Sequence, residues 1–166
     1  GKVIEFAFST MIDSEIKPQY RIGNQRCDFA ILRTKSHDLA VIYEFDGPQH
    51  YQSSYTFELD REKDKLAHER GVPVIRIPYF VQLCKEMLEY YFPGRNLTSE
   101  AKYPHGFISK KAPLPTTFTD RGLAYYCWQL QKMPRSVSNQ IWKSMIDRGV
   151  DPTKLAYLPM FILIQI

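Results

Sequence analysis

The sequence has few cysteines and none of the spacings that bind zinc or form a disulfide framework. Its three cysteines, Cys27, Cys84 and Cys127, are odd in number and lie far apart. Neither a disulfide-stapled domain nor a structural zinc site is indicated. The unpaired thiols favour a reducing, intracellular compartment.

Long hydrophobic runs, internal repeats and low-complexity segments are also lacking. The longest late apolar run, residues 160–164, is far shorter than the roughly 20 residues that cross a bilayer, so we expect no membrane partner. The hydrophobic and charged fractions, 44% and 24%, are typical of a globular protein. A chain of 166 residues is long enough for one domain with a hydrophobic core and a small accessory region.

The net charge is only +4, but it is unevenly distributed. Residues 1–79 hold 11 Lys/Arg and 12 Asp/Glu, whereas residues 80–166 hold 11 and 6. This asymmetry fits a polyanion held next to an acidic site, because Lys and Arg near phosphates release counterions. An ordinary solvated surface explains it equally well.

Hydrophobic periodicity predicts an opening helix and a strand meander. Residues 3–11 have helical spacing, whereas 20–23, 26–34 and 39–46 have the apolar, β-branched character of strands. The polar loop 35–38 separates the last two strands.

A helix over 56–70, capped by Thr56, a buried strand over 72–77 and a helix from 79 to about 91 are expected next. Gly71 ends the first of these helices, where a residue with positive φ is wanted. Strands separated by a helix require a crossover, which predicts an α/β protein with a mixed sheet.

The last part of the chain is predicted to be a helical appendage. Residues 95–117 show no clear period, and helices are expected over 120–132 and 137–148. We therefore expect a core formed by residues 1–93 and a C-terminal helical extension formed by residues 94–166.

Three acidic residues in the predicted strands suggest a metal site. Glu44 and Asp46 are two apart in a strand, so they project from the same face, and Asp28 from the preceding strand joins them if the strands pair. Close carboxylates repel unless a cation lies between them. Mg²⁺, or Mn²⁺ as a substitute, suits such oxygen ligands and promotes phosphodiester hydrolysis.

The turn Gly47-Pro48 places Gln49 and His50 near the same strand end. His50 is a candidate general base or leaving-group acid, since histidine transfers protons near neutral pH. Gln49 is a candidate for positioning water or a substrate oxygen. A hydrogen-bonded turn without catalytic function is the alternative.

These segments resemble the very-short-patch-repair-endonuclease-like branch of the PD-(D/E)XK nuclease superfamily, which includes related homing endonucleases. The resemblance spans roughly residues 2–80, and Asp60-Arg61 and Gly71 contribute to it. Its main segments are Arg26-Cys27-Asp28-Phe29, Tyr43-Glu44-Phe45-Asp46-Gly47-Pro48-Gln49-His50-Tyr51 and Val74-Ile75-Arg76-Ile77-Pro78-Tyr79.

The resemblance implies a restriction-endonuclease-like core and a Mg²⁺-dependent endonuclease acting on DNA, with a homodimer as one candidate state. Asp28 would be the principal metal ligand, Glu44 the acid of the D/E-x-K element, and Glu5 a carboxylate contributed by the first helix.

Asp46 departs from the superfamily pattern because it stands where a lysine is usual. Within this branch, His50 would take over proton transfer. Lys63 or Lys65 of the following helix would supply the positive charge, and the sequence leaves open which of the two does so.

Arg76 lies within a predicted buried strand, so it must pair or reach the surface. One interpretation is contact with a phosphate or with an active-site acid. The other is an internal ion pair with Asp60 or Asp64.

Two rival interpretations remain from sequence. The Glu44–His50 segment followed by 76–80 is also similar to RAP domains, PD-(D/E)XK-like modules associated with RNA, so RNA binding without cleavage is the alternative to DNA cleavage. A degenerate site in a protein that only binds its partners is the third interpretation.

Basic and aromatic residues alternate in the C-terminal region, a combination that suits phosphate contact and base stacking. Lys63 and Arg76 of the core, with Lys110 and Lys111, are our candidates for nucleic-acid contact. Aromatic residues at helical spacing are as readily explained as core. The region contains Lys102, His105, Lys110, Lys111, Arg121, Lys132, Arg135, Lys143 and Arg148, with Tyr103, Phe107, Tyr125, Tyr126, Trp128 and Trp142.

Overall fold

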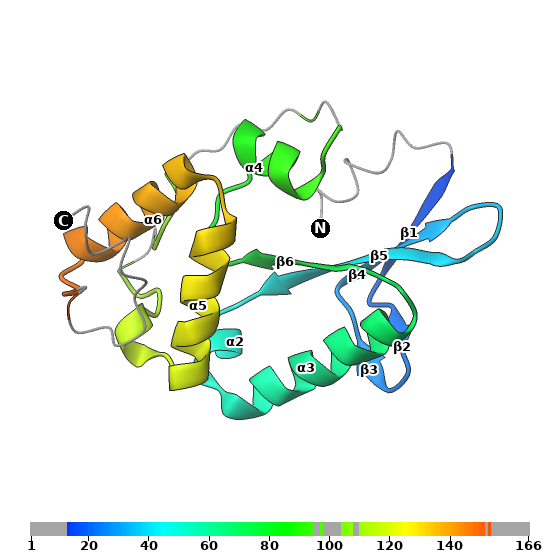
Figure 1. The fold of residues 1–166 in the computed structure, drawn as a ribbon, viewed down its shortest axis with the longest axis horizontal. Coiled ribbons are helices and arrows are strands. Elements are labelled where there is room, and N and C mark those ends of the chain that lie inside the picture. The colour runs from blue at the N-terminus through cyan, green and yellow to red at the C-terminus, as the bar shows by residue number, and fades with distance from the viewer. Residues whose placement is uncertain (1–12, 95–96, 98–103, 108–109, 152, 154–166) are drawn as a thin grey trace.

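The structure is a computed structural model that describes residues 13–94, 97, 104–107, 110–151 and 153 (Figure 1). The opening helix predicted over residues 3–11, and Glu5 with it, lies outside these residues. None of the helices in the described part of the chain combines the length and apolar character needed to cross a bilayer.

The centre of the fold is a mixed four-stranded sheet in the order β1-β4-β5-β6. Its strands are β1 (Ser14–Pro18), β4 (Phe29–Arg33), β5 (Leu39–Asp46) and β6 (Val74–Pro78). The first three form an antiparallel meander, and β6 runs parallel to β5 after a helical crossover. The predicted α/β class with a mixed sheet is confirmed.

The meander differs from the prediction at its beginning. Residues 14–18, for which the sequence pattern predicts no strand, form edge strand β1, whose polar, half-exposed sequence gives no alternating pattern. The segments expected as strands over 20–23 and 26–34 instead contribute β2 (Arg21–Ile22) and β3 (Gln25–Arg26), a separate small hairpin. The second of these segments is interrupted around Asp28 before β4 begins.

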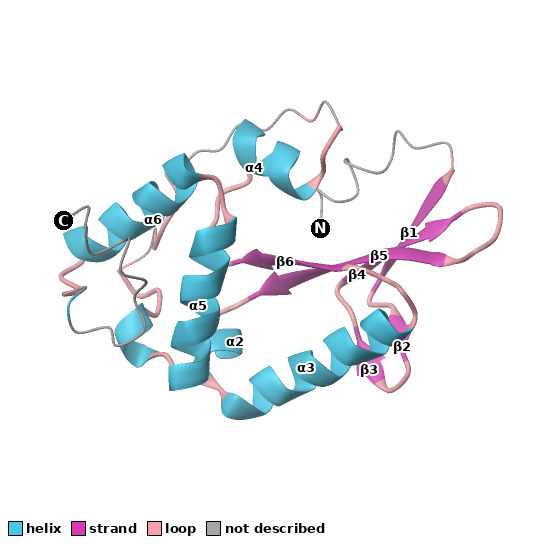
Figure 2. Cartoon of the chain, in the orientation of Figure 1, coloured by secondary structure: helices cyan, strands magenta, loops and turns pink. Residues whose placement is uncertain are grey.

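Helices follow the sheet strands and complete the fold (Figure 2). They are α2 (Gln49–Gln52), α3 (Ser54–Glu69), α4 (Lys85–Tyr91), the 3-10 helix η1 (Pro115–Thr117), α5 (Asp120–Lys132) and α6 (Arg135–Asp147). Ser53, rather than the predicted Thr56, caps α3, because its side chain accepts a hydrogen bond from the Thr56 backbone N–H. Gly71 follows α3 with φ +66°, as predicted.

Helix α4 begins six residues later than predicted. Residues 79–84 are not helical, and within them Phe80 and Val81 are buried in the core. Their apolar side chains mimic a helix stripe in the sequence, but their burial comes from tertiary packing.

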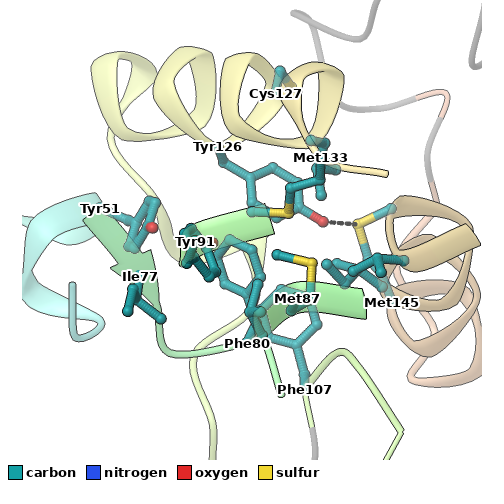
Figure 3. Packing of buried hydrophobic residues seen from close by; sticks show 14 of the residues in the cluster. Tyr51, Ile77, Phe80, Met87, Tyr91, Phe107, Tyr126, Cys127, Met133 and Met145 are labelled. Atoms are coloured by element: carbon teal, nitrogen blue, oxygen red, sulfur yellow. Dashed lines mark hydrogen bonds between the residues drawn. The ribbon is translucent and has the colours of Figure 1, made fainter. Parts of the chain in front are cut away.

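The sheet has two different faces. Tyr43 and Ile77 pack on the face that meets α4, α5 and α6 in the larger hydrophobic cluster. Figure 3 shows part of this cluster, with Ile77 of β6 and Tyr126 of α5 among the labelled residues. The opposite face meets α3, and a smaller cluster there contains Ile42, Cys27 and Ala67. Figure 1 shows α3 on one side of the strands, α4 on the other, and α5 standing across the end at which β5 and β6 finish.

The C-terminal helices share the larger cluster with the sheet. Tyr51 of α2 is fully buried, and its hydroxyl donates a hydrogen bond to Gln129 Oε1 of α5 at 2.7 Å. Gly122 of α5 lies so close to the Tyr51 backbone that a Cβ at position 122 would be 1.9 Å from the Tyr51 carbonyl oxygen. The expected division between residues 1–93 and 94–166 therefore crosses one continuous core.

Candidate functional site

A layer of charged side chains lies between the sheet and α3. Side chains alternate along a strand, so Ile42, Glu44 and Asp46 of β5 face the same way. Ile42 belongs to the apolar cluster under α3, whereas Glu44 and Asp46 continue that face with charge. In the parallel register Glu44 is opposite Arg76 of β6. The face changes from apolar to ionic towards the ends of these strands.

Glu44 forms a buried ion pair with Lys63 of α3. Lys63 Nζ lies 2.9 Å from Glu44 Oε1, and the two side chains are 9% and 4% exposed. Burial raises the pKa of Glu44 above its usual range, although Lys63 opposes the shift. Lys65 is 77% exposed and lies 3.9 Å from Glu69. Of the two lysines left open by the sequence, Lys63 is the one that reaches the site.

Arg76 is held by three aspartates. Its Nη1 donates to Asp46 Oδ1 at 2.8 Å, and its Nη2 lies 2.9 Å from Asp64 Oδ1 and 3.2 Å from Asp60 Oδ1. Burial would lower the pKa of Arg76, but the three carboxylates raise it well above its ordinary value. The internal ion-pair interpretation is observed, with both candidate acids and Asp46 as partners.

His50 lies between two of these carboxylates. Its Nδ1 is 2.5 Å from Asp60 Oδ2 and 3.6 Å from Asp46 Oδ1. Burial works to lower the pKa of His50, but the hydrogen bond that its Nδ1–H donates to Asp60 and the charge of Asp46 raise it above 6.5. Burial alone would raise the pKa of Asp60, but the hydrogen bond with His50 and the nearby positive charges lower it below its usual value. The two carboxylates therefore favour the protonated form of the imidazole over the neutral form.

The His50–Asp60 pair is expected to make stability depend on pH. A histidine whose pKa is higher in the folded than in the unfolded protein makes its full contribution to stability below the pKa of the unfolded state. That contribution is lost as pH rises through the pKa of the folded state. His50→Gln should therefore lower the free energy of unfolding by about 1–3 kcal/mol at about pH 6 and by much less at about pH 9. Urea denaturation at both pH values measures the difference. His68→Gln, an exposed histidine of α3, is the control, and a pH-independent loss would contradict the expectation.

Gln49 begins α2 and is exposed. Its side chain folds back over the preceding turn, so that a Cβ on Gly47 would lie 2.6 Å from Gln49 Oε1. The absence of a side chain at Gly47 thus allows Gln49 to stay next to the strand end that carries Asp46.

Asp28 lies beside Glu44, between β3 and β4. The register pairs Phe29 with Tyr43, and Asp28 Oδ2 accepts a hydrogen bond from the Phe45 backbone N–H at 2.8 Å. The negative charge of Asp28 is also near enough to contribute to the raised pKa of Glu44. The two acids therefore meet across the antiparallel pair, as predicted from the sequence.

Asp46 has other partners. Besides Arg76 on Oδ1, its Oδ2 accepts a hydrogen bond from the Tyr125 hydroxyl at 3.2 Å. Among the described residues no group of three or more His, Cys, Asp or Glu side chains is arranged to hold a metal ion. The expected convergence of Asp28, Glu44 and Asp46 on one metal ion is not found among the described residues. Glu44 pairs with Lys63 instead, and Asp46 pairs with Arg76.

Asp28 and Glu44 remain as a pair of adjacent carboxylates. Mg²⁺ is commonly bound through only one or two carboxylates, with waters and substrate phosphates completing its shell. The donor set of these two residues therefore fits a weakly held Mg²⁺.

The other predicted residues lie elsewhere. Lys110 and Lys111 are exposed on the connection before η1, where the Lys110 carbonyl accepts a hydrogen bond from Arg148 Nη2 at 2.8 Å. Tyr125 of α5 is the residue whose contact with the site sequence reasoning missed. It contacts Asp46 across 79 positions of the chain, and nothing in the local sequence pattern indicates so distant a contact.

Comparisons with protein-family models, with curated proteins and with solved structures found no match to this chain.

Proposed function

We propose that the protein is a metal-dependent endonuclease that hydrolyses phosphodiester bonds in DNA, on a restriction-endonuclease-like core. The observation that carries the proposal is the meeting of Asp28, Glu44 and Lys63 beside one end of the β4–β5 pair. Two acids and a lysine form the usual catalytic set of PD-(D/E)XK enzymes. Here Asp46 occupies the usual lysine position, and Lys63 reaches Glu44 from α3.

The charge balance of the layer supports a divalent cation. The layer contains five carboxylates, whereas Lys63 and Arg76 supply its fixed positive charge and His50 adds to it when protonated. The acids are Asp28, Glu44, Asp46, Asp60 and Asp64. The excess negative charge favours binding of a hard cation.

In this proposal Asp28 and Glu44 hold the Mg²⁺ ion. When bound, Mg²⁺ polarises a phosphate oxygen and lowers the pKa of coordinated water. Lys63 orients Glu44 and places positive charge next to the scissile phosphate. Because His50 Nδ1 is engaged by Asp60, a proton that His50 transfers leaves from Nε2. Its raised pKa suits His50 to protonating the leaving oxygen.

The test is cleavage of supercoiled plasmid, linear duplex, branched and single-stranded DNA in Mg²⁺ and in EDTA. We expect cleavage in Mg²⁺ only, and a loss of about 100-fold or more in Asp28→Asn, since a metal ligand is removed. Asp38→Asn, at an exposed aspartate in the loop before β5, is the matched control. Equal cleavage in EDTA, or by Asp28→Asn, would reject the proposal.

A nucleic-acid-binding module of the RAP kind, without cleavage, is the second candidate. It is favoured by the internal neutralisation of Glu44 by Lys63 and of Asp46 by Arg76. Binding of RNA that is unaffected by Mg²⁺, with every DNA and RNA substrate left intact, would support it over the nuclease.

A further inference from the structure

A column of stacked aromatic rings runs from the core to the surface of α5. Tyr51 stacks on Phe118 with ring centroids 5.0 Å apart and on Tyr125 at 5.8 Å. Tyr125 in turn stacks on Trp128 at 6.0 Å, with the two planes only 17° apart. Tyr51 is completely buried, whereas Trp128 is 53% exposed. The column therefore ends in an indole that solvent reaches.

Trp128 lies in a groove rather than on a flat surface. A cleft of about 530 Å³ is lined by Trp128, Tyr125, Phe57 and residues of the charged layer, among them Arg76. A second cleft of about 400 Å³ shares Trp128, Tyr125 and Arg76 and continues towards Lys132. The exposed indole lines both clefts, and we call the two clefts together the Trp128 groove.

The rim of the Trp128 groove is basic. Exposed Arg61 and Arg121 line its first cleft, and Lys132 lines its second, with its Nζ over the Trp128 ring at 5.9 Å from the ring centre. Arg121 lies over the Phe57 ring at 5.9 Å and pairs with Glu58. Cations beside an accessible ring are the combination that binds the phosphates and the base of a nucleotide.

The Trp128 groove adjoins the candidate active site. The Tyr125 hydroxyl reaches Asp46, and Asp60, Asp64 and Arg76 of the charged layer form part of the groove wall. A strand lying in the groove thus has its backbone next to the cluster that contains Glu44 and His50.

We propose that Trp128 stacks an unpaired base and that the substrate of this site is DNA with a single-stranded segment. The inference rests on the proposed nuclease function for its choice of DNA. Bases within a duplex already stack on both of their neighbours, so the indole at the end of the ring column suits a base that has left the helix better than one inside it. The bound base continues the column as its fifth ring and takes the place of the Lys132 ammonium over the indole.

The first experiment measures binding of a fluorescent thymidine 12-mer by anisotropy in EDTA, so that no cleavage occurs. Trp128→Ala should weaken binding by about 5- to 150-fold, the range expected for one base stack. Trp128→Phe should retain most of the affinity. Tyr55→Ala is the matched control, because Tyr55 is 75% exposed on α3 and does not line the groove. An unchanged affinity in Trp128→Ala overturns the inference.

Altered ligands separate stacking from charge. A 12-mer of abasic residues keeps the phosphates but lacks the bases, so the wild-type protein should bind it about as weakly as Trp128→Ala binds the thymidine 12-mer. A blunt duplex should be bound equally by wild type and Trp128→Ala. If the substitution weakens duplex binding as much as single-strand binding, the indole does not select unpaired bases. Tighter, Trp128-dependent binding of a uridine 12-mer would overturn the assignment to DNA.

Failure of this inference is distinguishable from failure of the nuclease proposal. Asp28→Asn should lose cleavage but keep the thymidine 12-mer affinity and the quenching of Trp128 fluorescence that stacking produces. Cleavage without any effect of Trp128→Ala on single-strand binding would reject base stacking on Trp128 and leave the nuclease proposal intact. Trp128-dependent binding without cleavage would reject the nuclease proposal and leave base stacking on Trp128 intact.

Discussion

Arg76→Leu should lower the free energy of unfolding by about 3–5 kcal/mol, because it leaves buried carboxylates without their cation. The side chain of Asp46 is completely buried, so water cannot replace the guanidinium there, whereas Asp60 is 14% exposed and keeps His50 as a partner. For a domain of this size the melting temperature should fall by roughly 6–20 °C. Arg61→Leu, at an exposed arginine of α3, should change stability by no more than about 0.5 kcal/mol.

The pH dependence of this loss identifies its cause. Burial raises the pKa of Asp46, and removal of Arg76 removes the main opposing charge. An acid whose folded pKa exceeds its unfolded pKa is destabilising when ionised, so protonation relieves the penalty. Urea denaturation should show Arg76→Leu approaching the wild type as pH falls from about 7 to about 5, and Asp46→Asn should restore part of the loss at neutral pH. A constant gap would mean that lost packing, not charge, causes the effect.

Lys63→Met should both slow cleavage and destabilise the fold. Loss of one preorganised positive group at a reacting phosphate is expected to reduce the rate by about 10²- to 10³-fold. Glu44 also becomes a buried, unpaired acid, at a cost of about 3–5 kcal/mol. Plasmid cleavage and urea denaturation measure the two effects separately.

A second substitution tells the two roles of Lys63 apart. Glu44→Gln combined with Lys63→Met removes both charges, so it should regain stability while cleavage stays low. Lys65→Met is the matched control, since Lys65 lies on the same helix two residues further on, is 77% exposed and contacts Glu69 instead of the charged layer. Wild-type cleavage by Lys63→Met would show that another group supplies the positive charge.

Sequence patterns predicted the elements whose signals are local. The bounds of β5 and α5 agree with the prediction, because β5 combines apolar character with a Gly-Pro break and α5 has Thr119 as its cap. Strand β1 was missed because an edge strand can be short and polar. The start of α4 was misplaced because residues 79–84 are buried for tertiary reasons.

The candidate site also divides into features that follow from local sequence and features that depend on tertiary packing. The common face of Glu44 and Asp46 follows from strand geometry alone, and the neighbouring position of Asp28 follows once the two strands pair. The choice between Lys63 and Lys65 depends on how α3 is rotated against the sheet, and the pairing of Tyr125 with Asp46 depends on where α5 docks. Such rotations and docking positions arise from packing of the whole chain, which periodicity does not encode.

The contact of Tyr51 with α5 has a consequence for how the protein is made. Tyr51 finds its partner Gln129 78 positions later, and Gly122 must pass against the Tyr51 backbone. A nascent chain that ends before α5 cannot bury Tyr51 or give Asp46 its Tyr125 hydrogen bond. We therefore expect the growing polypeptide to acquire its folded charged layer only after α5 has left the ribosome, which delays any activity of this site until that helix has been synthesised.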